Sequence, residues 1–258
     1  MSAETRALDH ALARLVEAKT ILVATDFDGV LAPLVDNPDD SRITPEGRAA
    51  LDALMESPGV TVALVSGRGL ANLRVVSQAD ERWWMVGSHG IEVEGPADKG
   101  AISVPTANED DRQAVWDDFV EVADRFPGTW VETKPWGAAL HTRGIDGETE
   151  ALVREAAREK IARYGEALTT RLGHGIIESS LQSQTKGDGL LALMREIQPD
   201  CTLFMGDDVT DEDALAVLGP DDVGVKVGEQ PSVAPYRIYS ISEVASFLAA
   251  IAEGRANN

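Results

Sequence analysis

Cysteine is almost absent from this sequence of 258 residues, which contains only Cys201. A single cysteine cannot form an intramolecular disulfide, and it excludes metal sites built from several cysteines. Cys201 opens the apolar run Cys201–Met205, where a cysteine usually behaves as a small apolar side chain. We therefore expect it to lie buried in a strand.

Positive charge is also scarce, because 23 lysines and arginines stand against 44 aspartates and glutamates and give a formal net charge of −21. A chain with this charge repels a phosphate backbone, so we expect no nucleic acid among its partners. A small phosphorylated ligand is not excluded, since a few well-placed cations or a metal ion neutralise it locally. The composition therefore leaves small anionic substrates open.

Long hydrophobic runs are missing as well. No apolar stretch approaches the roughly 18 residues that a membrane-spanning helix needs, and residues 1–14 have mixed charge without the apolar centre of a signal peptide. We expect a cytoplasmic protein with no membrane partner. With 43% hydrophobic residues, the chain can bury a substantial core, and its length fits a large domain with a smaller insertion.

Apolar segments alternate with amphipathic segments in both terminal parts of the chain. The apolar segments are typical of buried strands and the amphipathic ones of helices, which indicates an α/β fold with a parallel sheet covered on both faces. Strands are expected near residues 21–24, 60–65, 84–87, 202–205, 223–227 and 237–239. Helices are expected near residues 4–18, 45–56, 69–78, 187–197 and 242–252.

The middle of the chain has a different pattern. A capping box formed by Thr106 and Glu109 predicts a helix to about residue 126, and a second long helix is expected over residues 148–164. Short strands are expected near residues 102–104, 129–133, 138–142 and 175–179. This arrangement predicts an α+β insertion. The expected domains are a core of residues 1–100 and 183–258 and an inserted domain of residues 101–182.

Polar side chains follow several of the predicted strands. Because the carboxyl ends of parallel strands meet at one edge of a sheet, these side chains are expected to converge there. Carboxylates that converge repel one another unless a cation lies among them, and sites built from oxygen ligands favour Mg²⁺. The candidates are Asp26 and Asp28 after the first strand, Ser66 after the second, Lys186 at a helix start, and Asp207, Asp208 and Asp211 after residues 202–205.

A phosphoryl group would complete such a site. Mg²⁺ would screen its charge, and Lys186 and Ser66 would hold its remaining oxygens. One aspartate of the pair Asp26 and Asp28 could then attack phosphorus, while the other protonates the leaving alcohol and later activates water. Each feature alone has a simpler interpretation, as a turn, a helix cap or a surface lysine, but their joint occurrence at successive strand ends favours a catalytic site.

Several segments resemble the motifs of the haloacid dehalogenase superfamily, and in particular those of its trehalose-6-phosphate phosphatase family. The four main motifs are Asp26–Leu31, Val65–Arg68, Lys186–Gly187 and Gly206–Asp213. The segments Gly87–Glu92 and Glu132–Pro135 are also similar to that family. The resemblance extends over about residues 20–245 and implies a Rossmann-like three-layer core with an inserted α+β cap that determines substrate specificity.

The resemblance implies a role for each candidate residue. Asp26 would be the nucleophile and a metal ligand, and Asp28 the general acid and base, also contributing its backbone carbonyl to the metal. Ser66 and Lys186 would complete the catalytic set by binding the phosphoryl group. Asp207 would be a direct Mg²⁺ ligand, with Asp208 and Asp211 supporting the metal site. The implied substrate-binding residues are Arg68, His89, Glu132, Lys134 and Glu178.

The expected activity is Mg²⁺-dependent hydrolysis of trehalose 6-phosphate, with a sugar phosphate as the small-molecule partner. Two positions depart from the family pattern: Val30 replaces a threonine, and Ser180 stands where a cation is expected. Ser180 leaves open another substrate of the same mechanism, such as sucrose phosphate, glucosylglycerol phosphate or a cyclitol-containing trehalose mimic. A binding domain without chemistry and a phosphate-retaining mutase are alternatives from other classes.

Overall fold

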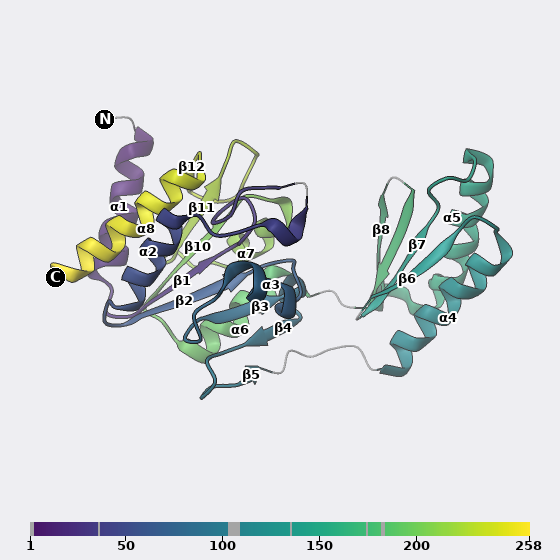
Figure 1. The fold of residues 1–258 in the computed structure, drawn as a ribbon, viewed down its shortest axis with the longest axis horizontal. Coiled ribbons are helices and arrows are strands. Elements are labelled where there is room, and N and C mark those ends of the chain that lie inside the picture. Colours follow the sequence, from purple (N-terminus) through teal and green to yellow (C-terminus); the bar gives the residue numbers. More distant parts are fainter. Residues whose placement is uncertain (1–2, 36, 103–108, 135, 174, 182–183) are drawn as a thin grey trace. The chain divides into compact units, whose positions relative to one another are not determined.

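The computed structural model describes residues 3–35, 37–102, 109–134, 136–173, 175–181 and 184–258. The chain divides into two compact units (Figure 1). The larger unit comprises Met1–Val104 and Gln184–Asn258, and the smaller unit comprises Pro105–Ser183. Within the described part of the chain, no helix has the length and apolar character required to cross a membrane.

The larger unit is built on an eight-stranded sheet with the order β12-β11-β10-β1-β2-β3-β4-β5. Its strands are β1 (Ile21–Thr25), β2 (Val60–Val65), β3 (Trp84–Gly87), β4 (Glu92–Glu94), β5 (Ala101–Ile102), β10 (Cys201–Gly206), β11 (Val223–Val227) and β12 (Tyr236–Ile238). The strands from β12 to β3 are parallel to their neighbours, as predicted. The predicted α/β class is therefore confirmed.

The sheet ends differently from the prediction, because β4 and β5 are antiparallel to their neighbours. Between β3 and β4 the chain reverses within Ser88–Gly90, where Ser88, His89 and Gly90 have φ angles of 49°, 56° and 105°. Such a short reversal contains no crossover helix, so the next strand returns antiparallel. Residues 101–102, expected in the insertion, form β5 and pair with β4 of this sheet.

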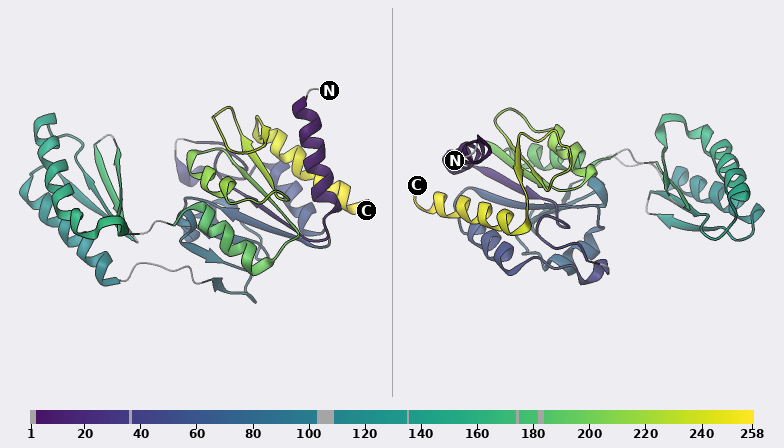
Figure 2. Two further views of the ribbon diagram at one scale, coloured as in Figure 1. Left: turned by 180° about the vertical axis from the view of Figure 1, so that it is seen from behind. Right: turned by 90° about the horizontal axis from the view of Figure 1, so that it is seen from above.

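Helices cover both faces of the larger sheet and complete three layers (Figure 2). One face packs against the helices α1 (Ala3–Glu17), α2 (Pro45–Met55), α3 (Leu70–Ser77) and α8 (Ile241–Ala256). The other face packs against the helices α6 (Lys186–Ile197) and α7 (Glu212–Ala216). Strands buried on both faces are apolar along their whole length, which is why the sequence pattern identifies them.

Local signals in the sequence place several of these elements correctly. The side chain of Thr44 accepts a hydrogen bond from the N–H of Gly47, and Pro45 occupies the first position of α2. Cys201 is buried in β10, as predicted, and Trp83 and Trp84 are buried as well. Burial raises the pKa of the Cys201 thiol to about 11, so this cysteine is a structural side chain.

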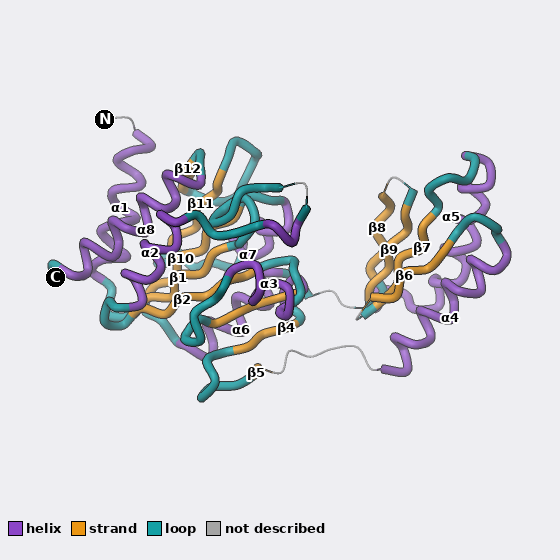
Figure 3. The backbone as a smooth tube through the Cα atoms, in the orientation of Figure 1, coloured by secondary structure: helices purple, strands orange, loops and turns teal. Residues whose placement is uncertain are grey.

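The smaller unit has a four-stranded antiparallel sheet with the order β6-β7-β9-β8. Its strands are β6 (Trp130–Lys134), β7 (Gly137–His141), β8 (Thr169–Gly173) and β9 (Ile176–Ser180). The helices α4 (Glu109–Arg125) and α5 (Gly147–Ile161) pack on one face of this sheet and share an apolar core with it (Figure 3). No helix of the described part of this unit covers the opposite face.

Two features of the smaller unit escape the sequence prediction. The strand β8 is not predicted, because all its residues are exposed at the sheet edge and show no apolar alternation. The expected second helix ends at Ile161 and continues as a 3-10 turn over Ala162–Ala167. Thr106, predicted to cap the first helix of this unit, lies outside the described residues.

Candidate active site

The carboxyl ends of three neighbouring strands carry predicted site residues. Asp26 follows β1, Ser66 follows β2 and Asp207 follows β10, and these strands are parallel neighbours in the sheet. Lys186 is the first residue of α6, whose N-terminus is fixed by a capping box between Thr185 and Asp188. Parallel strands present their carboxyl ends at one edge, so the topology gathers residues that are far apart in sequence.

A buried lysine lies between two buried aspartates. The Nζ atom of Lys186 is 2.9 Å from Oδ2 of Asp26 and 2.7 Å from Oδ1 of Asp211, and all three side chains are at most 6% exposed. The other oxygen of Asp26, Oδ1, accepts a hydrogen bond of 2.6 Å from the N–H of Phe27. These contacts hold the Asp26 carboxylate in one orientation at the end of β1.

Negative charge exceeds positive charge in this cluster. Burial raises the pKa of Asp26 to about 8, although the adjacent Lys186 opposes the shift. Burial, and then the charge of Asp211, raise the pKa of Asp207 to about 6. Burial lowers the pKa of Lys186, but Asp26 and Asp211 together hold it above its usual value. A further cation beside these carboxylates would favour their charged forms.

The donor set fits a hard divalent cation. Carboxylate oxygens of Asp26, Asp207 and Asp211 lie within 4.8 Å of one another. Oδ1 of Asp207 is buried and finds no hydrogen-bond partner among the described residues. Gly29 has a φ of 75°, and a Cβ there would lie 2.1 Å from Oδ2 of Asp207, so glycine permits this close approach of backbone and carboxylate. Buried oxygen ligands of this kind are those that Mg²⁺ takes.

Asp211 organises the loop that carries Asp207. Its Oδ1 atom binds Lys186, and its Oδ2 atom accepts the N–H groups of Asp207 at 2.9 Å and Asp208 at 2.8 Å. With these three donors bound, Asp211 is suited to support a metal site, whereas Asp26 and Asp207 are suited to bind the ion. The side chain of Asp208 lies exposed beside this loop.

Asp28 has different partners from Asp26. The Nε atom of Arg68 is 2.6 Å from Oδ2 of Asp28, and its Nη2 atom is 2.8 Å from Oδ1. Ser41 donates a further hydrogen bond of 3.0 Å to Oδ1. The guanidinium of Arg68, predicted to bind substrate, therefore holds the carboxylate of Asp28 in a bidentate pair.

The turn after β2 places Ser66 and His89 together. Ser66 is buried, and its hydroxyl accepts a hydrogen bond of 3.2 Å from the N–H of Arg68. A Cβ at Gly67 would lie 2.5 Å from Cε1 of His89, so the His89 ring lies directly against this turn. Val30, which stands where the family has threonine, is buried in the core of the larger unit. A threonine hydroxyl at this position would need a hydrogen-bond partner, whereas the methyl groups of Val30 pack in the apolar core without one.

The predicted residues of the smaller unit share one face of its sheet. Glu132, Ala139 and Glu178 are cross-strand neighbours in β6, β7 and β9, and side chains two positions apart lie on the same face. The Nζ atom of Lys134 is 2.8 Å from Oε1 of Glu132, and the Nε2 atom of His141 is 3.0 Å from Oε2 of Glu132. Ala139, the small residue between Glu132 and Glu178, is fully buried, and the charged groups surround it on this face.

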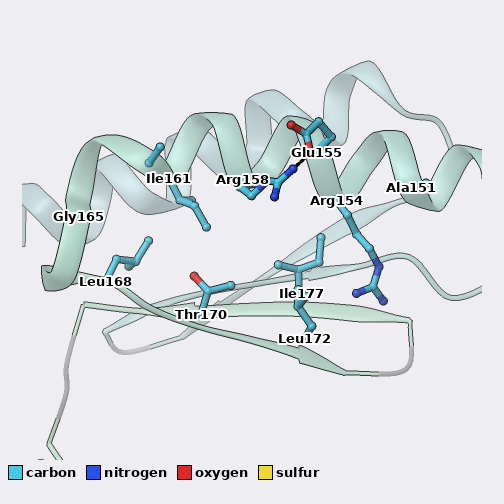
Figure 4. A pocket seen from close by; sticks show the side chains of 11 residues that line it. Ala151, Arg154, Glu155, Arg158, Ile161, Gly165, Leu168, Thr170, Leu172 and Ile177 are labelled. Atoms are coloured by element: carbon cyan, nitrogen blue, oxygen red, sulfur yellow. Dashed lines mark hydrogen bonds and ion pairs between the residues drawn. The ribbon is translucent and has the colours of Figure 1, made fainter.

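A different part of the smaller unit contains its large pocket. This pocket has a volume of about 640 Å³ and lies between α5 and the hairpin of β8 and β9 (Figure 4). Thr170, Leu172 and Ile177 line it, so it opens on the face of the sheet opposite to Glu178. None of the predicted site residues lines this pocket, so its size does not make it the reaction centre.

Three residues in or near these clusters are not found by the sequence prediction. Ser41 and Asn72 contact Asp28 and Arg68, but they come from other segments and carry no local signal. Trp130 stacks on His141 with ring centroids 3.7 Å apart and an interplanar angle of 3°. Alternate residues of a strand lie on one face, so Trp130 and Glu132 share a face of β6. The sequence spacing of these two residues could therefore have identified Trp130.

Known proteins with similar sequences point to one enzyme family. Residues 24–242 match the family model described as trehalose-phosphatase. The trehalose-phosphate phosphatase of Mycobacterium tuberculosis is 30% identical over 247 residues, an alignment that covers 89% of this chain and 61% of the relative. The chain thus spans about three fifths of the length of that relative.

Solved structures share the fold. The trehalose-6-phosphate phosphatase of Aspergillus fumigatus superimposes with a TM-score of 0.79 at 21% identity, covering 95% of this chain and 97% of that one. A haloacid dehalogenase-like hydrolase from B. subtilis superimposes with a TM-score of 0.58 at 17% identity, covering 88% and 98%. These likenesses establish a haloacid dehalogenase-like fold. Because the family model matches most of its length, the chain belongs to the trehalose-phosphatase family.

Proposed function

We propose that the chain is a Mg²⁺-dependent phosphatase that hydrolyses trehalose 6-phosphate to trehalose and phosphate. The observation that carries this proposal is the buried carboxylate of Asp26, held by Lys186 beside Asp207 at the carboxyl edge of a parallel sheet. Family membership supports the same reaction.

The proposed reaction has two steps. A carboxylate oxygen of Asp26 attacks phosphorus, the bond to the sugar oxygen breaks, and Asp28 gives its proton to the leaving alcohol. Water then attacks the aspartyl-phosphate, with Asp28 as the base, and releases phosphate. Lys186 and Ser66 hold the phosphoryl oxygens. Asp26, Asp207 and the backbone carbonyl of Asp28 would hold Mg²⁺, which would neutralise charge on the phosphoryl group.

We assign recognition of the sugar to the smaller unit, as a cap on the core formed by residues 1–100 and 183–258. Glu132, Lys134 and Glu178 would hydrogen-bond its hydroxyl groups, and Arg68 and His89 would lie near the phosphate. Support comes from the shared face of the cap residues, where acidic and basic side chains alternate around small ones. A sugar offers both donors and acceptors to such a surface.

One observation favours a second candidate substrate. Ser180, which replaces the expected cation, pairs in register with Gly137 and Thr169. This row of the sheet is built from small side chains, so it would admit a bulkier group than a row that contains arginine. A phosphate of another glycoside, hydrolysed by the same mechanism, is therefore the alternative.

Phosphate release measured with Mg²⁺ tests the proposed function. The substrates are trehalose 6-phosphate, sucrose 6-phosphate, glucose 6-phosphate and 4-nitrophenyl phosphate. We expect trehalose 6-phosphate to have the highest kcat/KM. Turnover of the aryl phosphate with no preference for trehalose 6-phosphate would retain the chemistry and reject the substrate. Absence of turnover with all four esters would reject the phosphatase itself.

A stability measurement tests the metal site independently of activity. Saturating Mg²⁺, at about 100 times its dissociation constant, stabilises a one-site protein by about 2.7 kcal/mol and should raise the Tm by about 5–10 °C. We expect Asp207→Asn to remove most of this shift. The control Asp213→Asn changes an exposed acid of the same segment and should keep it. An equal shift in wild type and Asp207→Asn would contradict the assignment of Asp207 as a ligand.

A further inference from the structure

The larger unit also has a cavity, which lies beside Asp28. Its volume is about 490 Å³, within the range of about 300–1,000 Å³ that is typical of small-molecule sites. We call it the flap cavity, since part of its wall is the loop that follows the first motif. Its lining is Asp28, Leu34, Val35, Pro38, Asp39, Arg68, Gly69 and Asn72.

The guanidinium of Arg68 makes three side-chain hydrogen bonds at the wall of the flap cavity. Its Nε and Nη2 atoms bind the two oxygens of Asp28, and its Nη1 atom donates a bond of 2.8 Å to Oδ1 of Asn72. Asn72 in turn donates a bond of 2.8 Å to Asp39. The guanidinium carbon also lies 5.4 Å from the centre of the Phe27 ring. Arg68 is thus held on several sides and presents a fixed fork to Asp28.

The lining combines the apolar and the hydrogen-bonding surface that a sugar ring needs. Leu34 is 74% exposed and Val35 is 43% exposed, so both offer apolar contact area to a ligand. Asp39 and Asn72 add a carboxylate and an amide on the same wall. A pyranose ring has an apolar C–H face and a rim of hydroxyl groups, and this cavity complements both.

We propose that the flap cavity binds the ring of the leaving alcohol that carries the phosphate, whereas Glu132, Lys134 and Glu178 recognise the rest of the sugar, and that Arg68 is a positioning residue which orients Asp28 toward the leaving oxygen. This inference rests on the proposed phosphatase function. As the bond between phosphorus and the sugar oxygen breaks, that oxygen takes the proton of the Asp28 carboxyl group. Asp28 is then a carboxylate, and the Arg68 fork together with Ser41 holds it in place for the next step.

Leaving-group dependence separates this role from phosphate binding. The 4-nitrophenolate ion is a stable leaving group, whereas a sugar alkoxide has to be protonated as it leaves, so only sugar phosphates depend strongly on Asp28. The quantity compared is kcat/KM, because it covers the steps up to loss of the alcohol and omits hydrolysis of the aspartyl-phosphate.

We expect Arg68→Ala to lower kcat/KM about 100-fold or more with trehalose 6-phosphate and glucose 6-phosphate, but less than about tenfold with 4-nitrophenyl phosphate. Arg68→Lys keeps the charge without the fork and should give an intermediate loss on the sugar phosphates. The matched control is Arg74→Ala on α3, the helix that follows Arg68, which removes an exposed pair with Glu94 and should retain wild-type kinetics. Equal losses on both classes of ester would make Arg68 a phosphate ligand and overturn the proposal.

Inhibition by the free alcohol tests the cavity itself. We expect Asn72→Ala to raise the inhibition constant of trehalose about tenfold, because one hydrogen-bonding group is removed, while that of inorganic phosphate changes less than twofold. If Arg68→Ala does not fold, this variant and Arg68→Lys still decide the question. An unchanged trehalose constant would reject the cavity as the alcohol site. Wild-type protein inert toward every ester would instead reject the underlying phosphatase function.

Discussion

Asp26→Asn is expected to lower kcat/KM for every phosphate ester by at least about 10⁴-fold, because it removes the carboxylate that we propose as the nucleophile. The side chain keeps its shape, and its remaining oxygen can still accept the hydrogen bond from Phe27. Lys186 also keeps its pair with Asp211. The Tm should therefore change by no more than about 4 °C, the shift that about 1 kcal/mol produces in a domain of this size.

The measurement is phosphate release beside a thermal unfolding curve. The control Asp52→Asn makes the same chemical change at an exposed aspartate that pairs with Arg48, and it should retain full activity. Loss of the fold in Asp26→Asn would leave the variant uninformative about chemistry, so the unfolding curve is part of the test. A folded Asp26→Asn protein with near wild-type turnover would eliminate Asp26 as the nucleophile.

Lys186→Met is expected to affect both activity and stability. It leaves Asp26 and Asp211 buried without their shared cation, and breaking a buried pair in this way costs about 3–5 kcal/mol. Loss of the positive group that we propose to bind the phosphoryl oxygens should also lower kcat/KM by about 10²–10³-fold. Urea unfolding in EDTA at pH 8 measures the first effect, and phosphate release with Mg²⁺ measures the second.

The stability cost should depend on pH with a defined sign. Burial already raises the pKa of Asp26 to about 8 in the folded chain, above its ordinary value of 3.8, and removal of Lys186 raises it further. Between these values the folded state binds more protons than the unfolded state, so the free energy of unfolding falls as pH rises. In Lys186→Met this fall continues above pH 8, where that of the wild type levels off, so the deficit of the variant should be larger at pH 9 than at pH 7.

A double variant shows whether the loss of stability in Lys186→Met arises from the buried carboxylates that have lost their cation. Asp26→Asn/Lys186→Met removes the charge of Asp26 along with that of the lysine, so it should be more stable at pH 8 than Lys186→Met alone. It also remains measurable if the single variant fails to fold. Equal stability of the two variants at pH 8 would show that the ion pair is not the reason for the loss.

Much of the fold is readable from the sequence because its signals are local. An apolar run such as Val60–Val65 is a strand in the structure with the same limits, and the helix start at Thr44 and Pro45 is formed as predicted. The antiparallel strand β8 could not be predicted, since Thr169–Gly173 lies exposed at an edge and its pairing with β9 is a long-range property.

The sequence by itself determined which chemical groups this protein has and where along the chain they occur. Asp26, Ser66 and Asp207 follow apolar strands, and the rule that parallel strands end at one edge was enough to predict their convergence. Family motifs then suggested their roles. These inferences need only spacing and residue type, which are properties of short segments.

The tertiary structure alone decided which groups pair with one another. Lys186 pairs with both Asp26 and Asp211, and Arg68 pairs with Asp28, whereas the sequence offers each cation several carboxylates within the same motifs. Side-chain partners depend on distances of a few ångströms between segments that are 25 or more residues apart, as Lys186 and Asp211 are. Only packing of the strands and helices sets those distances, so the different partners of Asp26 and Asp28 are seen only in the folded chain.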